Sequence, residues 1–197
     1  MAVTQPWFAA RDESGPAPRW LDDEERAAWL SIVRIAVTLP AALDVQLERE
    51  EGLNYFEYIV LAMLSEQPDL VLRMSALADV TNASLSRLSH VAKRLEGRGL
   101  MLREADPSDG RCTNAVLTEA GLATVRRAAP GHVAAVRALV IDAMSRTQLR
   151  QLRQANERIL ARTDPEAVTK PPASRLHRHH GHDGAPDPAC VLTRSVT

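Results

Sequence analysis

Apolar residues recur every three or four positions through most of the chain, which is the spacing of an amphipathic helix. In the first such stretch, Asp22 can cap a helix, and the acidic residues after it suit the positive end of the helix dipole. Pro40 predicts a kink or a break, because proline cannot donate a hydrogen bond to the preceding turn. Gly52 and Asn54 mark the end of this helix. Its apolar positions are Leu30, Val33, Val37, Ala41 and Val45.

A second helix is predicted over residues 56–67, followed by two helices separated by a polar turn. Ser75 is a natural N-cap for the first of this pair, residues 76–80, and either Asn82 or Ser84 can cap the second. The second helix extends to about residue 98 and has two distinct faces. Its apolar face contains Leu85, Leu88, Val91, Ala92 and Leu95, and its polar face contains Ser86, Arg87, Ser89, His90, Lys93 and Arg94.

After this helix the pattern changes to that of strands. Residues 100–104 and 113–117 are predicted to form two strands that are joined by a turn-rich polar tip. Helices resume with Thr118 as an N-cap, are interrupted at Pro130, and end with a helix capped by Thr147. The pattern therefore predicts a mainly α fold with a small β-wing, in which a helix pair and a strand pair form a winged helix-turn-helix.

Charge is unevenly distributed along a chain whose formal net charge is only −1. Residues 1–60 carry five arginines against eleven acidic residues, whereas residues 118–163 carry eight arginines against three. An acidic first third ahead of basic later segments permits binding to nucleic acid without demonstrating it. Because the chain has only two Phe and two Tyr, Leu and Ala must fill most of the core, which favours helices.

The polar face of the predicted helix that ends near residue 98 carries the residue types that contact DNA. The major groove admits a helix, and phosphates flank the groove on both sides. Short hydroxyl side chains together with Arg or Lys would therefore meet base edges and phosphates. An ordinary solvated helix face has the same composition and remains the alternative. The candidate DNA contacts are Ser84, Ser86, Arg87, His90, Lys93 and Arg94.

The tip between the two predicted strands carries the sequence Asp109-Gly110-Arg111. A guanidinium at the tip of a strand pair suits a narrow minor groove, where the negative potential attracts arginine. Asp109 would hold the Arg111 side chain by a charge-assisted hydrogen bond, or would simply cap the turn. Asp109 and Arg111 therefore join the candidate DNA contacts, with a plain hairpin turn as the alternative.

The stretch from Leu95 to Gly121 resembles the multiple-antibiotic-resistance regulator (MarR) family of bacterial winged-helix repressors. The order and length of the predicted helices also match this family, so the resemblance covers about residues 21–163. Many members carry a second basic residue at the position of Gly110, so the wing contact is expected to depend mainly on Arg111. The matching motifs are Leu95-Glu96, Gly99-Leu100, Asp106-Pro107, Asp109-x-Arg111 and Leu117-Thr118-Glu119-Ala120-Gly121.

The resemblance implies a homodimeric regulator, expected to be a repressor, that binds double-stranded DNA at a near-palindromic operator and responds to a small-molecule effector. Residues 21–54 and 118–163 would form a helical dimerisation base, and residues 55–117 would form the winged helix-turn-helix lobe. The sequence does not locate the effector pocket. The family's DNA contacts correspond to Ser84, Ser86, Arg87 and His90 in the helix and to Asp109 and Arg111 in the wing.

The two ends of the chain have no periodic pattern. Residues 1–20 are expected to form a flexible arm, and residues 164–197, rich in Pro and His, a disordered tail. The histidines between His177 and His182 could bind Zn²⁺ or Ni²⁺, either adventitiously or as a sensor. Cys112 lies next to the wing arginine and is either a redox switch or a bystander thiol.

Neither catalysis nor membrane insertion is predicted. The sequence has no Gly-rich phosphate loop and no HExxH or CxxC motif, so no enzymatic activity, cofactor or metal site is expected. No signal pattern opens the chain and no apolar run approaches the roughly 20 residues that cross a bilayer, which predicts a cytoplasmic protein. The alternative function is a helical dimer that mainly binds a protein or a metal through its arm and tail.

Overall fold

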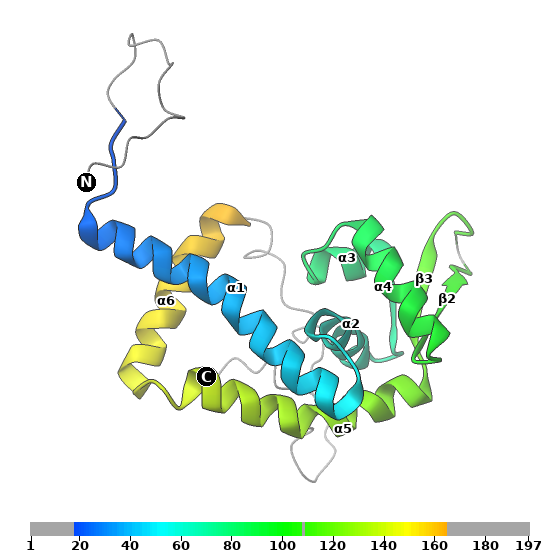
Figure 1. Cartoon of the computed structure of the whole chain (residues 1–197). Coiled ribbons are helices and arrows are strands. Elements are labelled where there is room, and N and C mark those ends of the chain that lie inside the picture. Colours follow the sequence, from blue (N-terminus) through cyan, green and yellow to red (C-terminus); the bar gives the residue numbers. More distant parts are fainter. Residues whose placement is uncertain (1–17, 108, 165–197) are drawn as a thin grey trace, which may run out of the picture. The chain divides into compact units, whose positions relative to one another are not determined.

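The computed structural model of the chain describes residues 18–107 and 109–164 (Figure 1). The described residues up to Val37 belong to one compact unit, and those from Thr38 onward belong to a second. Helix α1, Asp23–Glu51, begins in the first unit and ends in the second. The expectations for the flexible arm, the tail and its histidines concern residues that lie mostly outside the described ones.

The first unit contains the start of α1. Asp22 caps this helix as predicted, because its Oδ1 accepts the backbone N–H of Glu25 at 2.8 Å and the Glu25 carboxylate accepts that of Asp22 at 3.0 Å. The apolar side chains of this part of α1 are exposed, with 39–69% of their surface accessible. They are Trp29, Leu30, Ile32, Val33, Ile35 and Val37.

Helix α1 continues through Pro40, so of the kink or break predicted there the break is wrong. The second half of the helix buries Leu43 and Leu47, and this packing outweighs the single hydrogen bond that proline cannot donate. The helix ends at Glu51, and Gly52 after it has a φ of +63°, which suits glycine at a helix C-terminus. By length and composition α1 could also cross a membrane, with a mean hydropathy of 1.6 over its most apolar window. The sequence prediction had not recognised this stretch.

The second unit confirms the mainly α fold with a small β-wing. Its strands form one antiparallel sheet in the order β1-β3-β2. Figure 1 shows α3, α4 and the β2–β3 hairpin in green, close to one another. The elements are α2 Tyr55–Ser65, β1 Val71–Arg73, α3 Met74–Val80, α4 Leu85–Gly97, β2 Met101–Ala105, β3 Thr113–Leu117, α5 Glu119–Val136, a π-helical segment Arg137–Ile141, and α6 Arg146–Thr163.

Helix α2 forms the centre of the core. It packs against α3, α5 and strand β3, and most of its side chains are buried. Asn54 and Glu57 close its first turn as a capping box, in which each side chain accepts the other's backbone N–H. The largest side chains that the second unit buries around α2 include Leu47, Leu53, Tyr58, Leu61, Leu77, Leu88, Leu95, Met101 and Val125.

Three local predictions in this unit are wrong. Ser75 does not cap α3, because that helix already begins at Met74. Helix α5 passes through Pro130 without interruption, since Ala128 and Ala129 beside it are fully buried. Helix α6 is capped by Ser145 rather than Thr147, because Gln148 completes a capping box only with a residue three positions earlier. Strand β1 was also missed, as three residues carry too little alternation to be recognised.

Candidate nucleic-acid interface

Helix α4 is fixed on the second unit by its apolar face. Leu88, Val91, Ala92 and Leu95 are all at least 96% buried, and the helix contacts α3 and β2. Ser84 caps it by accepting the backbone N–H of Arg87 at 3.2 Å, as one of the two predicted alternatives. Gly99 follows it with a φ of +69°. The packing leaves the opposite face of α4 exposed.

The predicted DNA contacts on this exposed face are in different situations. Ser84, Ser86, His90 and Lys93 are exposed. Arg87 is also exposed, but its guanidinium lies 4.1 Å from the centre of the Phe56 ring in α2, as a cation–π pair. This contact holds the Arg87 guanidinium against α2, although the residue stays exposed.

Arg94 is the most constrained of the predicted contacts. Its Nε donates to Glu57 Oε1 at 2.9 Å, and the Glu57 side chain is only 7% exposed. A buried carboxylate requires a positive partner, because an unpaired charge is strongly disfavoured in the interior. Arg94 therefore joins α4 to α2, which the sequence interpretation of a purely DNA-facing side chain did not anticipate.

The β2–β3 hairpin forms the predicted wing, and Asp106 closes the loop at its tip. Asp106 accepts a hydrogen bond from Arg73 Nε at 3.1 Å through Oδ2 and from the Asp109 backbone through Oδ1. Its backbone N–H donates to the carbonyl of Cys112. These contacts tie strand β1 to the wing and close the loop that joins β2 to β3.

The wing tip has the arrangement that the sequence predicted for Asp109 and Arg111. Asp109 Oδ1 accepts both the backbone N–H of Arg111, at 3.1 Å, and its Nε, at 3.2 Å. These hydrogen bonds, with the backbone one dominant, lower the pKa of Asp109, so the carboxylate stays ionised at neutral pH. The Arg111 side chain is 92% exposed. The tip thus presents an oriented guanidinium to the surroundings.

A second ion pair connects α4 with the wing. Arg103 in β2 donates through Nε and Nη2 to Glu96 Oε2 in α4, at 2.9 and 2.6 Å. This pairing lowers the pKa of Glu96. Helix and wing are therefore joined by a polar contact in addition to their apolar one. The sequence interpretation did not identify this pair, because the two residues are seven positions apart and lie in elements of different period.

A cavity of about 420 Å³ lies between the second half of α1, α2 and α4. Both acidic and basic groups line it, together with the aromatic residues Tyr55 and Phe56. Three of its lining residues, Arg87, His90 and Arg94, are predicted DNA contacts. The lining residues are Pro40, Asp44, Asn54, Tyr55, Phe56, Arg87, His90, Val91 and Arg94.

Two further residues change the interpretation of this interface. Leu85 was assigned to the buried face of α4, but it is 53% exposed at the first turn of the helix. An apolar side chain there can contact the methyl group of thymine. The polar side chains of serine and arginine cannot make this apolar contact.

Cys112 is a free thiol, and burial together with the nearby Asp109 carboxylate raises its pKa, which disfavours the reactive thiolate. The bystander alternative fits this geometry better than the redox switch.

Comparison with known proteins relates this arrangement to DNA-binding regulators. The model of the MarR family matches residues 53–113. The crystal structure of Sco3205, a MarR family transcriptional regulator from Streptomyces coelicolor in complex with DNA, is 40% identical with a TM-score of 0.73 and covers 76% of this chain and 94% of that chain. The structure of AbsC, a MarR family regulator of the same organism, is also 40% identical, with a TM-score of 0.72, and covers 76% and 100%.

A curated relative points in the same direction. The transcriptional repressor MprA of Escherichia coli strain K12 is 28% identical over 116 residues. The match covers 59% of this chain, and the chain spans 65% of the length of that repressor. The segment that the family model matches, residues 53–113, contains α2, the helix-turn-helix and the wing up to the start of β3.

Proposed function

This chain belongs to the MarR family of transcriptional regulators, and we propose that it is a dimeric repressor whose α4 and wing bind double-stranded DNA. The observation that carries the proposal is the joint presentation of the exposed α4 face and the oriented Arg111 guanidinium. The helix would enter the major groove, where Ser86 contacts base edges and Lys93 contacts a phosphate. Arg111 would reach the adjacent minor groove.

The dimer is supported by apolar surface that the described chain does not cover. The first part of α1 exposes Trp29, Ile32 and Ile35, and α6 exposes Leu152 and Ile159. Apolar area of this kind is stabilised when it is removed from water. Residues 21–54 and 118–163 would form the dimerisation base with a second copy, and 55–117 the DNA lobe. Two lobes would then present helices about one DNA turn, roughly 34 Å, apart. Such a DNA-bound dimer would work in the cytoplasm.

Control by a small molecule is supported by the cavity beside α4. A ligand there would touch Arg87, His90 and Arg94, whose side chains also belong to the proposed DNA interface. Such a ligand would weaken DNA binding only by as much as its affinity for the DNA-free protein exceeds its affinity for the DNA-bound protein. Because this coupling is reciprocal, any compound that DNA displaces must weaken DNA binding by the same factor. Fluorescence titrations of such a compound, with and without DNA, would test the linkage.

The DNA-binding proposal is tested by selecting sites from a random duplex library and measuring their affinity by fluorescence anisotropy. The wild type should enrich paired half-sites, and its affinity should fall steeply with salt, because phosphate contacts release counterions. Arg111→Ala should weaken binding and reduce the salt slope by about two ions, one for each subunit of the proposed dimer. Arg126 in α5 offers a matched control, since it is exposed and forms no ion pair among the described residues. Equal behaviour of Arg111→Ala and Arg126→Ala would contradict the wing assignment.

The proposed dimer is tested by sedimentation. The wild type should sediment with twice the 21.6-kDa mass of the chain, and Ile35→Glu in α1 should shift it towards the monomer. Wild-type protein that remains monomeric in solution but partitions into neutral lipid vesicles would overturn this interpretation of the exposed face of α1.

A further inference from the structure

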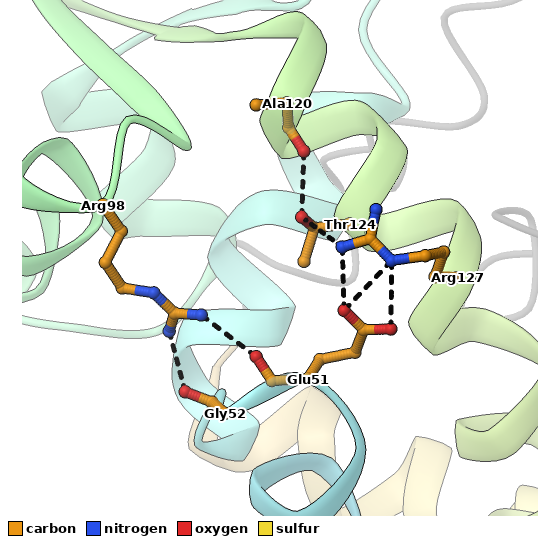
Figure 2. Close-up of polar contacts among 6 residues, drawn as sticks. All are labelled: Glu51, Gly52, Arg98, Ala120, Thr124 and Arg127. Atoms are coloured by element: carbon orange, nitrogen blue, oxygen red, sulfur yellow. Dashed lines mark hydrogen bonds and ion pairs between the residues drawn. The ribbon is translucent and has the colours of Figure 1, made fainter.

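Arg98 connects the end of α4 to the end of α1 (Figure 2). It follows the last residue of α4, and its backbone N–H still donates to the carbonyl of Arg94. Its side chain extends to α1, where Nη1 donates to the Gly52 carbonyl at 2.7 Å and Nη2 to the Glu51 carbonyl at 3.0 Å. Carbonyls at a helix C-terminus have no partner within the helix and carry its negative dipole end. A guanidinium supplies both the hydrogen-bond donors that these carbonyls lack and the positive charge that suits the negative end of the dipole.

Glu51 is also held from the opposite direction by α5. Its carboxylate accepts hydrogen bonds from Arg127, from Nη2 at 2.9 Å and from Nε at 3.3 Å, and its side chain is only 14% exposed. Thr124 Oγ1 accepts Arg127 Nη2 at 3.0 Å and donates to the Ala120 carbonyl at 2.9 Å. Figure 2 shows the two arginines approaching Glu51 from different sides. One residue at the end of α1 thus receives arginines from α4 and from α5.

This contact differs from the other polar contacts that α4 makes among the described residues. Arg94 pairs with α2, and Glu96 pairs with β2, and both of these partners belong to the proposed DNA lobe. Arg98 instead bonds to α1, which belongs to the proposed dimerisation base. Its two hydrogen bonds therefore cross the boundary between the proposed DNA lobe and the proposed dimerisation base.

We propose that Arg98 is a positioning residue: by fixing the end of α4 to the C-terminal end of α1 and, through Glu51, to α5, it sets the spacing of the two recognition helices in the dimer. The inference rests on the proposed dimeric DNA-binding function. Arg98 contributes no base contact of its own in this role. Its loss should leave each lobe able to bind a half-site, while the dimer becomes tolerant of half-sites at the wrong separation.

The test compares three duplexes made from the selected operator: a single half-site, the paired site, and the paired site with one base pair inserted at its centre. In the wild type the insertion should reduce affinity strongly. Arg98→Ala should bind the single half-site like the wild type but lose discrimination between the two paired sites by about twofold to thirtyfold, the range for residues that couple two sites. Arg98→Lys should be intermediate, because one ammonium replaces a two-pronged donor.

Controls separate positioning from loss of fold and of charge. Arg126→Ala removes one exposed positive charge from α5 and should keep the spacing preference of the wild type. Arg127→Ala removes the other arginine at Glu51 and should shift the preference in the same direction as Arg98→Ala. Circular dichroism verifies folding, and if Arg98→Ala unfolds, Arg98→Lys and Arg127→Ala carry the test.

The outcomes of this experiment distinguish the two proposals. If the wild type discriminates between the spacings and the folded Arg98 and Arg127 variants do so equally well, the positioning role is overturned while DNA binding stands. A uniform loss of affinity for all three duplexes, single half-site included, would make Arg98 a direct DNA contact and would also overturn it. If the wild type binds no duplex, the proposed function falls and this inference with it.

Discussion

Helices α4 and α6 are built alike, yet only one of them buries its apolar face within the chain. Each begins after a serine that accepts the backbone N–H three residues on, at 3.2 Å for Ser84 and 3.3 Å for Ser145. Each mixes Leu with Arg on an amphipathic pattern. Helix α4 nevertheless buries four apolar residues, whereas α6 has no buried residue, and its Leu152, Ile159 and Leu160 are 40–50% exposed.

The difference separates two kinds of information in an amphipathic pattern. The pattern establishes that one face of a helix must leave water, and it does so equally for α4 and α6. It does not establish which chain supplies the covering surface. Helix α4 finds α3 and β2 in its own chain, whereas α6 would find a second copy. The stability that α6 gains from burial of its apolar face should therefore depend on protein concentration, whereas that of α4 should not.

The largest effect is expected for Leu88 in α4. Leu88→Ala removes a fully buried side chain and leaves a cavity in the core, so it should lower the free energy of unfolding by about 2–5 kcal/mol. Urea titrations monitored by circular dichroism measure this loss. The decrease should be the same at low and high protein concentration, and a decrease that vanishes at high concentration would mean that a partner chain shares this part of the core.

A smaller and different effect is expected for Leu152 in α6. Leu152→Glu should raise the dimer dissociation constant by about tenfold or more, because burial of one leucine contributes roughly 1.5–3 kcal/mol. Sedimentation across a concentration series measures the constant. Leu88→Ala serves as the control, since it weakens the fold without touching the proposed interface. If Leu152→Glu leaves the dimer intact, α6 is not part of its interface.

Adjacent residues of α4 allow a finer comparison within one helix face. Lys93 is exposed and pairs with no acid among the described residues, whereas Arg94 pairs with the buried Glu57. Lys93→Ala should keep stability but weaken DNA binding and reduce its salt slope by about two, one for each subunit of the proposed dimer. Arg94→Ala should cost about 1 kcal/mol of stability, a value discounted because Arg94 is 54% exposed. Thermal unfolding measures the effect on stability, and anisotropy titrations measure the effect on DNA binding. If Lys93→Ala lowered the stability and Arg94→Ala reduced the salt slope, the roles assigned to the two residues would be reversed.

Elements with strong local signals were predictable from the sequence. The caps at Asp22, Ser84 and Thr118 were each found, since a polar side chain before a periodic stretch satisfies orphan N–H groups wherever it occurs. The strands of the wing were found because turn residues separate two short runs of period two. These signals require only a few consecutive residues.

Features that depend on distant residues were not predictable. The prolines at 40 and 130 stay inside helices because buried neighbours stabilise the surrounding turns, which the local rule ignores. Arg87 and Arg94 carry the signature of DNA contacts, but Phe56 and Glu57, more than thirty positions away, determine where their side chains lie. The contacts of Arg98 with the end of α1 span 46 and 47 residues and have no sequence signature at all.

The smallest effect expected is a dependence of stability on pH through His132. This α5 residue is fully buried, with its ring 4.6 Å from that of Tyr58 and 5.9 Å from that of Tyr55. Burial lowers the pKa of His132 below its ordinary value of 6.5, while burial raises the pKa of Tyr58 to about 12, so both phenols stay neutral. The unfolded chain therefore binds more protons below pH 6.5 than the folded one.

Stability should accordingly be fully present above about pH 6.5 and decline as the pH falls from there towards the lowered pKa of His132. Hydrogen bonds lower the pKa values of the Glu50, Glu96 and Asp109 carboxyls below the ordinary 4.5 of Glu and 3.8 of Asp, so these groups change the stability only in a more acidic range. His132→Phe should remove the decline between pH 6.5 and 5. Because His132 lies in a core that needs no partner, the decline in the wild type should not change with protein concentration. If the stability declined with falling pH only as the dimer dissociated, the titrating group would lie in the exposed surfaces of α1 and α6 instead.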